Sequence, residues 1–281
     1  MTDGKIVIIG ANGKTGSRVE ARLKAAGRLA LGVSRSTTPA FDWVDPSTWR
    51  AVLEGAKGAY LTYHPDLSVP EAESHIRMFC EVARDVGLEH VVLLSGRGEE
   101  GATRAEQVLR ESGLAWNVVQ ASWFAQNFSE NFMLDGILAG ELVLPAGTSR
   151  EPFIDVDDIA DVAVAAFMEP GLRNRLFEVT GPRAMTFAEC VDEISAAAGY
   201  PVRLIELPLD AYVQALRDQD LPEYLVELLR ELFTDLFDGR NAHTAEGVRE
   251  ALGRPANDFS EYARKTAALG AWVRQDAGKV A

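Results

Sequence analysis

A glycine-rich segment near the start of the chain has the composition of a phosphate-binding loop. The residues GANGKTG, Gly10 to Gly16, directly follow the apolar run KIVIIG and open an amphipathic helical pattern. A pyrophosphate can approach the backbone there because glycine has no Cβ, and the helix N-terminus adds unpaired amides and the positive end of a dipole. Strand, loop and helix in this order predict that a dinucleotide binds here.

The end of the second apolar run indicates which dinucleotide. Sites that prefer NAD usually present an acidic side chain to the ribose 2′-hydroxyl, but the sequence here reads GVSRS, without Asp or Glu near Arg35. A guanidinium favours the additional 2′-phosphate of NADP. We therefore expect NADP(H) as the cofactor. The alternative is that Arg35 is an ordinary exposed surface residue.

The elements that position these residues can be predicted from the first half of the chain, where strand and helix patterns alternate. Short apolar runs alternate with helical patterns, which predicts a parallel sheet with helices on both faces. The predicted fold class is α/β, a Rossmann doubly wound parallel sheet with a smaller, mostly helical C-terminal substrate domain. Strands are expected over 5–10, 29–34, 58–63, 90–95, 115–120 and 175–181, and helices from Lys14, Glu71 and Thr103 and over 155–167.

The chain is expected to form two domains. The NADP(H)-binding domain is expected over 1–181, with 123–150 contributing to the substrate cleft, and the smaller substrate-binding domain over 182–281. The latter opens with Thr186, three residues before Glu189, as in a capping box. Its segment 221–237 carries leucines along one side. That stripe is either a core-facing surface or a substrate lid or dimer contact, so we expect a monomer or a homodimer.

Composition excludes several classes of partner. Acidic residues number 42 against 28 basic ones, a net charge of -14, so nucleic acid is not expected as a partner. No apolar run approaches the roughly 20 residues that span a bilayer, and no signal peptide precedes the first strand, which predicts no membrane partner and a cytoplasmic protein.

Cys80 and Cys190 fit core thiols. No metal is expected, because no ligand spacing relates the four histidines, His64, His75, His90 and His243.

The ends of the predicted strands mark a candidate cleft. In a doubly wound sheet the ligand lies outside the carboxyl ends of the strands. Four short loops follow such ends, over 41–43, 62–65, 95–98 and 120–123, and each mixes glycine, hydroxyl or aromatic groups. Together they outline a cleft for a small-molecule substrate, although ordinary loops have similar compositions.

Six segments spread over nearly the whole chain resemble one known family in sequence, order and spacing. They are GANGKTG, FDWVDPSTW, VVLLSG, ASWFAQNF, PFIDVDDIADVAVAA and VTGPRAMTF. The resemblance is to the NmrA-like atypical short-chain dehydrogenase/reductases. It extends to bacterial NAD(P)H-binding members, to quinone reductases and to the clavine-type iminium reductases, which share the pattern W-F-x-x-N-F. It implies an extended Rossmann fold, a small C-terminal substrate domain and NADPH as the usual ligand.

The resemblance also implies roles for individual residues. Arg35 matches the 2′-phosphate ligand, and Asp42 with Trp43 matches the adenine-side contact. The phosphate loop is matched by Gly10, Asn12, Gly13, Thr15 and Gly16, and Lys14 in the same loop is expected to join them. The ribose and nicotinamide would be bordered by Thr62, Tyr63, Ser95, Gly96, Ala121, Ser122 and Trp123.

One helix departs from the wider superfamily. Ordinary members carry a Tyr-x-x-x-Lys pair there, in which the lysine lowers the tyrosine pKa so that the hydroxyl can pass a proton to a carbonyl. Here the helix reads GATRAEQVLRESG, and Ala102 and Glu106 occupy the two positions. In addition, Gln120-Ala121 stands where the family usually has Arg-Pro. Alcohol dehydrogenation through a Tyr/Lys relay is therefore disfavoured.

Hydride transfer to an already polarised acceptor needs orientation more than a dedicated acid. Four candidate catalytic residues are expected beside the nicotinamide, namely Tyr63, Ser95, Arg97 and Glu106. Tyr63 could donate a proton or stack, Arg97 could hold an anionic substrate, and Glu106 could attract a cationic one. The substrate contacts are expected from Trp123, Phe124 and Asn127. The alternative interpretations are loop packing, a solvated arginine, a surface helix acid and core aromatics at a domain junction.

Two functions follow from these residues, and a non-redox reaction in which NADP is only structural is a third alternative. The first is an NADPH-dependent reductase of a small organic acceptor, such as an iminium, a quinone or an enone. The second is an NmrA-like regulatory protein that senses NADP(H) without turnover, which the missing Tyr/Lys pair favours. Fold analogy alone does not choose the substrate.

Overall fold

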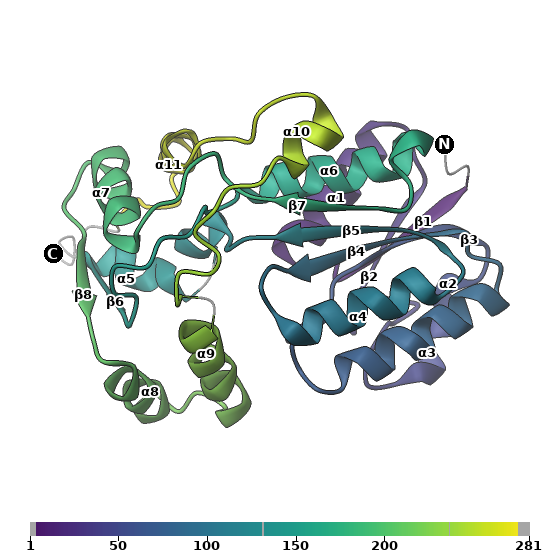
Figure 1. Cartoon of the computed structure of the whole chain (residues 1–281), viewed down its shortest axis with the longest axis horizontal. Coiled ribbons are helices and arrows are strands. Elements are labelled where there is room, and N and C mark those ends of the chain that lie inside the picture. Colours follow the sequence, from purple (N-terminus) through teal and green to yellow (C-terminus); the bar gives the residue numbers. More distant parts are fainter. Residues whose placement is uncertain (1–3, 131, 236, 275–281) are drawn as a thin grey trace, which may run out of the picture. The chain divides into compact units, whose positions relative to one another are not determined.

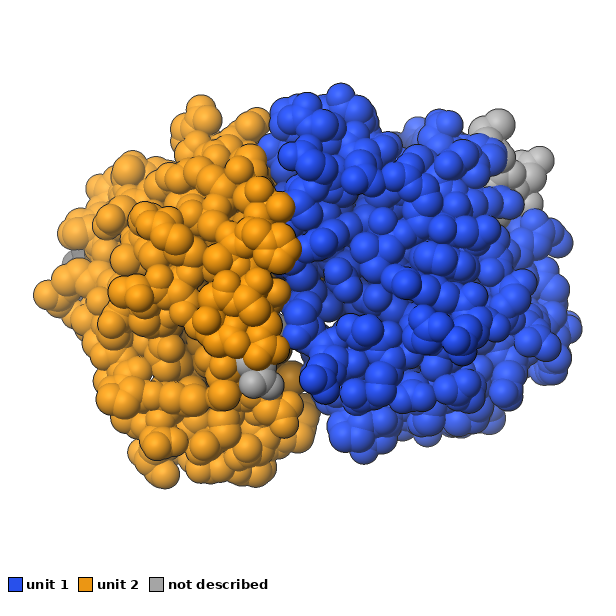
Figure 2. Space-filling model, in the orientation of Figure 1, with its two compact units in different colours: residues 1–122, 156–180, 245–256 blue, residues 123–155, 181–244, 257–281 orange. Residues whose placement is uncertain are grey.

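The chain folds into two compact units, which we describe separately from a computed structural model (Figures 1 and 2). The structure describes residues 4–130, 132–235 and 237–274. The first unit comprises 1–122, 156–180 and 245–256, and the second comprises 123–155, 181–244 and 257–281. The chain therefore passes between the two units several times. The assignment of cofactor and substrate roles to 1–181 and 182–281 stays a prediction.

The first unit is built on a six-stranded parallel sheet with the order β2-β1-β3-β4-β5-β7. Its strands are mostly continuous apolar runs, as expected of strands that are covered on both faces. The predicted doubly wound α/β fold is confirmed, because the order reverses direction at β1 and all strands run in parallel. The strands are β1 (Lys5–Ile9), β2 (Ala30–Val33), β3 (Ala56–Leu61), β4 (His90–Gly96), β5 (Ala115–Ala121) and β7 (Arg175–Val179).

Helices cover both faces of this sheet (Figure 1). On one face, α3 (Ala72–Asp85) and α4 (Glu100–Glu111) share a hydrophobic core with alternate residues of β1, β3, β4 and β5. On the other face α1 (Lys14–Ala25) packs against α6 (Val156–Met168). The remaining elements of the unit are the 3-10 turns η1 (Pro46–Thr48) and η3 (Pro170–Leu172) and the short helices α2 (Trp49–Leu53) and α10 (Gly247–Leu252).

The second unit is mostly helical and has an aromatic core. Its two-stranded sheet pairs β6 (Glu141–Leu144) in parallel with β8 (Arg203–Glu206). Phe128, Phe153 and Phe187 are buried in contact with one another. The helical elements are η2 (Ala125–Phe128), α5 (Met133–Ala139), α7 (Phe187–Ala198), α8 (Leu209–Asp218), α9 (Glu223–Asp235) and α11 (Phe259–Ala268).

Local signals in the sequence agree with several of these elements. The capping box at the start of α7 is confirmed, because the Thr186 hydroxyl accepts from the Glu189 amide and the Glu189 carboxylate accepts from the Thr186 amide. Cys80 and Cys190 are buried free thiols, as predicted. The predicted start of α4 at Thr103 is wrong by three residues, since the helix begins at Glu100. Strand β6 was not expected from the sequence.

The leucine-bearing segment 221–237 contains α9. Leu229 and Leu232 pack against the core of the second unit, whereas Tyr224 is exposed. Leu236 lies outside the described residues.

Within the described ranges no helix combines the length and the apolar character needed to cross a membrane. A search of the same residues for three or more His, Cys, Asp and Glu side chains able to hold a metal ion finds no such group.

His90 at the start of β4 is a buried titratable group. Its Nε2 lies 2.8 Å from Asn117 Oδ1, and its ring packs on Phe167. Burial lowers the pKa of His90 to about 4, partly opposed by the Asn117 hydrogen bond, and Arg173 lowers it further. The unfolded chain binds this proton at an ordinary pKa near 6.5, so the contribution of His90 to stability is present above that pH. It is lost as the pH falls towards 4.

We therefore expect His90→Gln to remove an acid-sensitive contribution of up to about 3 kcal/mol. Glutamine can still donate an amide N–H to Asn117 but does not titrate. Urea unfolding of both proteins at several pH values between 4 and 8 measures the effect. The stability of wild type relative to the variant should be constant above pH 7 and should fall as the pH drops from about 6.5 to 4. A difference that does not change over this range would contradict the assignment.

Candidate cofactor site

The loop between β1 and α1 has no room for side chains at two of its glycines. Gly10 has a φ of +78°, and a Cβ there would lie 2.0 Å from Thr62 Oγ1. A Cβ on Gly16 would lie 2.3 Å from the carbonyl oxygen of Gly10, which is backbone and cannot rotate away. Gly13 precedes the first residue of α1 and makes no side-chain cap hydrogen bond, and helix N-termini of this kind bind anions through their first amides. The loop therefore fits a pyrophosphate, as the sequence predicted.

Thr62 connects the phosphate loop to the neighbouring strand end. Its hydroxyl donates to the carbonyl of Ile9 at 3.1 Å, and its own carbonyl accepts from the indole N–H of Trp43 at 3.0 Å. Trp43 is 6% exposed and packs among Phe41, Trp49, Tyr63 and Phe79. This indole therefore positions the Thr62 carbonyl from within the core. A contact of Asp42 and Trp43 with an adenine stays a prediction.

The end of β2 presents polar groups beside the phosphate loop. Asn12 Nδ2 donates to Ser34 Oγ at 3.2 Å, and Ser34 Oγ lies 3.1 Å from Ser36 Oγ. The Arg35 side chain is exposed, and no hydrogen bond or ion pair engages its guanidinium among the residues that the structure describes. Nearby, Glu20 of α1 accepts from the backbone amide of Gly32. An exposed guanidinium can make charge-assisted hydrogen bonds to a phosphate, and the assignment of Arg35 to the 2′-phosphate stays a prediction.

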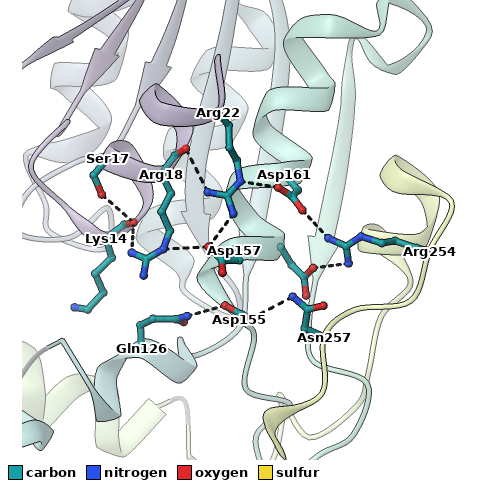
Figure 3. A network of polar contacts seen from close by, with 11 residues as sticks. Lys14, Ser17, Arg18, Arg22, Gln126, Asp155, Asp157, Asp161, Arg254 and Asn257 are labelled. Carbon is teal, nitrogen blue, oxygen red and sulfur yellow. Dashed lines mark hydrogen bonds and ion pairs between the residues drawn. The ribbon is translucent and has the colours of Figure 1, made fainter. Parts of the chain in front are cut away.

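Helix α1 is held against α6 by a ladder of ion pairs (Figure 3). Asp157 accepts from Arg18 Nε at 3.2 Å and from Arg22 Nη2 at 2.8 Å. Asp161 accepts from Arg22 Nε at 2.7 Å and, through its other oxygen, from Arg254 Nη2 at 2.7 Å. Since α1 carries the phosphate loop at its N-terminus, this ladder fixes the orientation of that loop on the sheet.

A buried carboxylate of α4, Glu106, lies at the carboxyl end of β4. Glu106 is 2% exposed, and its Oε1 accepts from Ser95 Oγ at 2.6 Å and from Gln120 Nε2 at 2.9 Å. Arg110 lies 3.5 Å from its other oxygen. The interpretation of Glu106 as a surface acid is therefore wrong. The network joins β4, β5 and α4, because Ser95 and Gln120 are register partners.

The other two catalytic candidates in the first unit also have partners. The Tyr63 hydroxyl lies 2.6 Å from His75 Nδ1, and burial together with the charge of Glu71 raises the pKa of Tyr63 to about 12. Arg97 is 4% exposed, and its Nε lies 2.5 Å from Glu178 Oε1 of β7. Arg97 is therefore a buried ion-paired residue, and its interpretation as a solvated arginine is wrong.

The strand ends bring several predicted cofactor contacts together. Gly96 pairs in register with Ala121, and the Arg97 amide donates to the Ala121 carbonyl at 3.0 Å. Ser122 is 3% exposed, and its amide donates to the carbonyl of Val179 at 3.1 Å. Together with Thr62 and Ser95 they line the carboxyl ends of β3, β4 and β5. Their contact with ribose or nicotinamide stays a prediction.

The predicted substrate residues belong to the second unit. The Trp123 amide donates to Glu151 Oε1 at 3.2 Å, and its ring contacts Phe187, Phe233 and Phe237. The sequence indicated such an aromatic junction as one alternative for Trp123. Phe124 precedes the turn η2, and its carbonyl accepts from the amide of Asn127.

Sequence reasoning missed two acidic residues near the end of β4. Glu99 lies three residues beyond Gly96, and Asp66 lies in the loop after β3. The candidate loops ended at residues 98 and 65, one residue short in each case. A glutamate beside a helix start has no distinctive sequence signal, because acidic residues are common in that position for the helix dipole. Its burial is a property of the folded loops.

Comparison with known proteins gives the family. No protein-family model matches the chain. The chain is 32% identical over 286 residues to the NAD(P)H azoreductase of Xenophilus azovorans, a match that covers 94% of this chain and 98% of that protein. It is 27% identical to festuclavine dehydrogenase of Aspergillus fumigatus, over 96% of this chain and 99% of that protein.

Solved structures show the same fold at lower identity. The Citrobacter sp. triphenylmethane reductase complexed with NADP(H) superposes with a TM-score of 0.78 at 17% identity, covering 94% of this chain and 99% of that one. The Escherichia coli NADPH-dependent quinone oxidoreductase complexed with NADPH gives 0.79 at 18% identity, covering 92% and 99%. NmrA, a negative transcriptional regulator in complex with NADP, gives 0.74 at 14%, covering 96% and 97%. Given the azoreductase match over nearly its full length, the chain belongs to the NmrA-like atypical short-chain dehydrogenase/reductases, a family of NAD(P)H-dependent reductases.

Proposed function

We propose that this chain is an NADPH-dependent reductase of a small organic acceptor such as an iminium, a quinone or a conjugated enone. The observation that carries the proposal is the phosphate loop, where a Cβ on Gly16 would meet the Gly10 carbonyl at 2.3 Å. Such a loop has space for a pyrophosphate and exposes the first amides of α1. Bound NADPH supplies the hydride for a reduction.

The residues of the first unit have distinct roles in this proposal. The loop from Gly10 to Gly16, with Asn12, Lys14 and Thr15, holds the pyrophosphate. Arg35 is proposed to bind the 2′-phosphate, because its side chain is exposed and it stands between Ser34 and Ser36 in the sequence. The strand ends at Thr62, Ser95 and Gly96, with the turn over 121–123, border the ribose and nicotinamide. Trp123, Phe124 and Asn127 are proposed to contact the substrate.

The proposed class of acceptor follows from two residues of α4, Ala102 and Glu106. The family resemblance predicts that Ala102 and Glu106 stand at the positions of the superfamily's tyrosine and lysine. The Glu106 carboxylate already accepts from Ser95 and Gln120, and the Tyr63 hydroxyl pairs with His75. Neither group replaces a tyrosine whose pKa is lowered by lysine. A polarised acceptor is therefore favoured over a simple alcohol or ketone, and the names of two relatives, an azoreductase and a festuclavine dehydrogenase, are consistent with such an acceptor.

The second candidate function is NADP(H) sensing without turnover. It is favoured by the same engaged hydroxyls, and NmrA, a regulator by name, shares the fold. A cytoplasmic location, a monomeric or homodimeric state and the lack of nucleic-acid partners stay predictions.

A panel of acceptors separates the two candidates. The purified protein with NADPH is mixed with an iminium, a quinone and an enone, and loss of the reduced-nicotinamide absorbance is followed. The reductase proposal expects many turnovers per chain on at least one acceptor class. Tight NADPH binding with no oxidation above background for any acceptor would contradict it and favour the sensor.

A further inference from the structure

The hydroxyl groups of two candidate catalytic residues are already engaged. Ser95 Oγ donates to Glu106 at 2.6 Å, and the Tyr63 hydroxyl lies 2.6 Å from His75 Nδ1. The pKa of Tyr63 is about 12, well above neutral pH, because of burial and the nearby Glu71. A reduction that places negative charge on an acceptor oxygen needs another proton source at the carboxyl end of the sheet.

Glu99 lies directly over that strand end. The residue precedes the first residue of α4, and its carboxyl group packs on Gly96 of β4. A Cβ on Gly96 would lie 2.3 Å from Glu99 Oε1 and 2.4 Å from Oε2, so the missing side chain at Gly96 makes the space that this carboxyl occupies. Gly96 is also one of the residues proposed to border the nicotinamide. The carboxyl therefore stands beside the proposed site of hydride transfer.

Two loops are packed together in a way that pairs Glu99 with a second carboxyl group. A Cβ on Gly101 would lie 2.4 Å from the Ser68 carbonyl oxygen, so the loop after β3 meets the start of α4 backbone to backbone. That loop contains Asp66, whose Oδ1 accepts from the Ser68 amide at 2.8 Å. Asp66 acts on the Glu99 side chain through its charge and through hydrogen bonding, and both raise the pKa of Glu99. Two carboxyl groups close together disfavour ionisation of both.

The surroundings put a proton on Glu99. Burial raises the pKa of Glu99 to about 9, with further contributions from the charge of Asp66, the hydrogen bond with Asp66 and the charge of Glu106. Glu106 is itself held by Ser95, Gln120 and Arg110. Glu99 Oε2 is buried and has no hydrogen-bond partner among the described residues. The neutral acid is favoured at this point, because burial penalises the ionised form.

We propose that Glu99 is the catalytic proton donor of this reductase, with Asp66 as the positioning residue that keeps it protonated. The inference rests on the proposed function. For an enone, the β carbon receives a hydride from the reduced nicotinamide and forms a C–H bond, the π electrons move to the carbonyl oxygen, and that oxygen takes the proton of Glu99. For a quinone, one carbonyl oxygen receives the hydride and forms an O–H bond, the π electrons move through the ring to the other oxygen, and that oxygen takes the proton of Glu99. The nicotinamide is left oxidised and Glu99 ionised, until water returns a proton to it.

The acceptor classes therefore differ in their need for Glu99. An iminium becomes a neutral amine when it receives the hydride, because its π electrons neutralise the positive nitrogen. No proton is required in that step. Glu99 should matter for quinones and enones and should not matter for iminium ions.

The Glu99→Gln variant tests this difference. Glutamine has the shape of the neutral acid and can donate a hydrogen bond, but it cannot release a proton. We expect kcat on a quinone or enone to fall by about 100-fold or more. The iminium rate and the Kd for NADPH should stay within a few-fold of wild type. Glu100→Gln, which alters the exposed neighbouring glutamate, should leave every rate unchanged. No loss on quinones, or an equal loss on all acceptors, would overturn the proposal.

A spectroscopic measurement tests the proton without turnover. The infrared difference spectrum between wild type and Glu99→Gln at pH 7 should show the carbonyl stretch of a protonated carboxylic acid in wild type. In wild type the band should disappear as the pH rises through about 9. In Asp66→Asn it should disappear at lower pH, and the alkaline limb of the quinone pH-rate profile should move in the same direction. Absence of the band in wild type would overturn the assignment of the proton.

The two measurements also separate this inference from the proposed function. If wild type oxidises NADPH with none of the acceptors, the reductase proposal fails and the catalytic role of Glu99 fails with it. The infrared band then still decides whether Glu99 holds a proton. If wild type turns over and Glu99→Gln is equally active on quinones, the reductase proposal stands and the inference about Glu99 is wrong.

Discussion

Replacing Gly16 with alanine is expected to weaken NADPH binding by at least about 100-fold, equivalent to about 2.7 kcal/mol. The new Cβ would lie 2.3 Å from the carbonyl oxygen of Gly10 and 2.8 Å from its carbonyl carbon. Because both are backbone atoms, the loop must move away from the start of α1. The movement displaces the amides that are proposed to bind the pyrophosphate. Calorimetric titration with NADPH measures the loss.

Two further variants show whether the effect belongs to the loop. Gly171→Ala adds a methyl group where nothing lies within 4 Å, and it should bind NADPH like wild type. Gly13→Ala places a Cβ 3.2 Å from the Gly10 carbonyl, so it should fold with less strain than Gly16→Ala while still obstructing the phosphates. Thermal unfolding of the apoprotein confirms that each variant is folded. NADPH affinity close to wild type in folded Gly16→Ala would contradict a pyrophosphate site at this loop.

Replacing Arg35 with alanine is expected to weaken NADPH about 10- to 100-fold and NADH by less than about twofold. The difference corresponds to a charge-assisted phosphate contact of about 1.5 to 3 kcal/mol, which only the 2′-phosphate makes. The exposed guanidinium is consistent with a ligand role, because none of the described residues pairs with it. Removing it should therefore alter nucleotide choice with little effect on the free energy of unfolding.

A second surface arginine provides the control. Arg50 is also exposed in the first unit, where it pairs with Asp85 at 3.2 Å. Arg50→Ala changes the net charge equally, but it lies in α2 and not at the end of β2. Its affinities for both nucleotides should match wild type. If Arg35→Ala weakens NADPH and NADH by the same factor, the 2′-phosphate assignment is wrong.

The sequence predicts the cofactor half of the fold well because its signals are local. The strand, glycine loop and helix at residues 5 to 25 lie next to one another in the chain, and α1 begins at Lys14 as expected. The close approach between Gly16 and Gly10 also arises within a single turn. Likewise, the capping box at Thr186 and Glu189 needs only residues three apart. Interactions of this range leave a pattern that a single sequence reveals.

The site depends on contacts that such patterns do not contain. The indole of Trp43 reaches the Thr62 carbonyl from a buried aromatic cluster, a contact that the sequence did not indicate. Tyr63 finds its partner on α3, at His75, and Arg97 reaches across β5 to Glu178 of β7. The burial of Glu99 arises where the loop after β3 meets the start of α4. Each of these contacts depends on tertiary packing. Packing determines the exposure and the pKa of a side chain, but the residues that it brings together are not separated by a characteristic number of residues in the sequence.

Calorimetric titration of the purified protein with NADPH, NADP⁺, NADH and NAD⁺ is the most direct test of NADP(H) binding by this chain. We predict that one NADPH binds per chain and that NADP⁺ binds as well. The Kd of each should be at least about tenfold lower than the Kd of NADH and of NAD⁺. Binding of the four nucleotides with equal affinity, or no heat with any of them, would contradict an NADP(H) site formed by the Gly10 to Gly16 loop and Arg35.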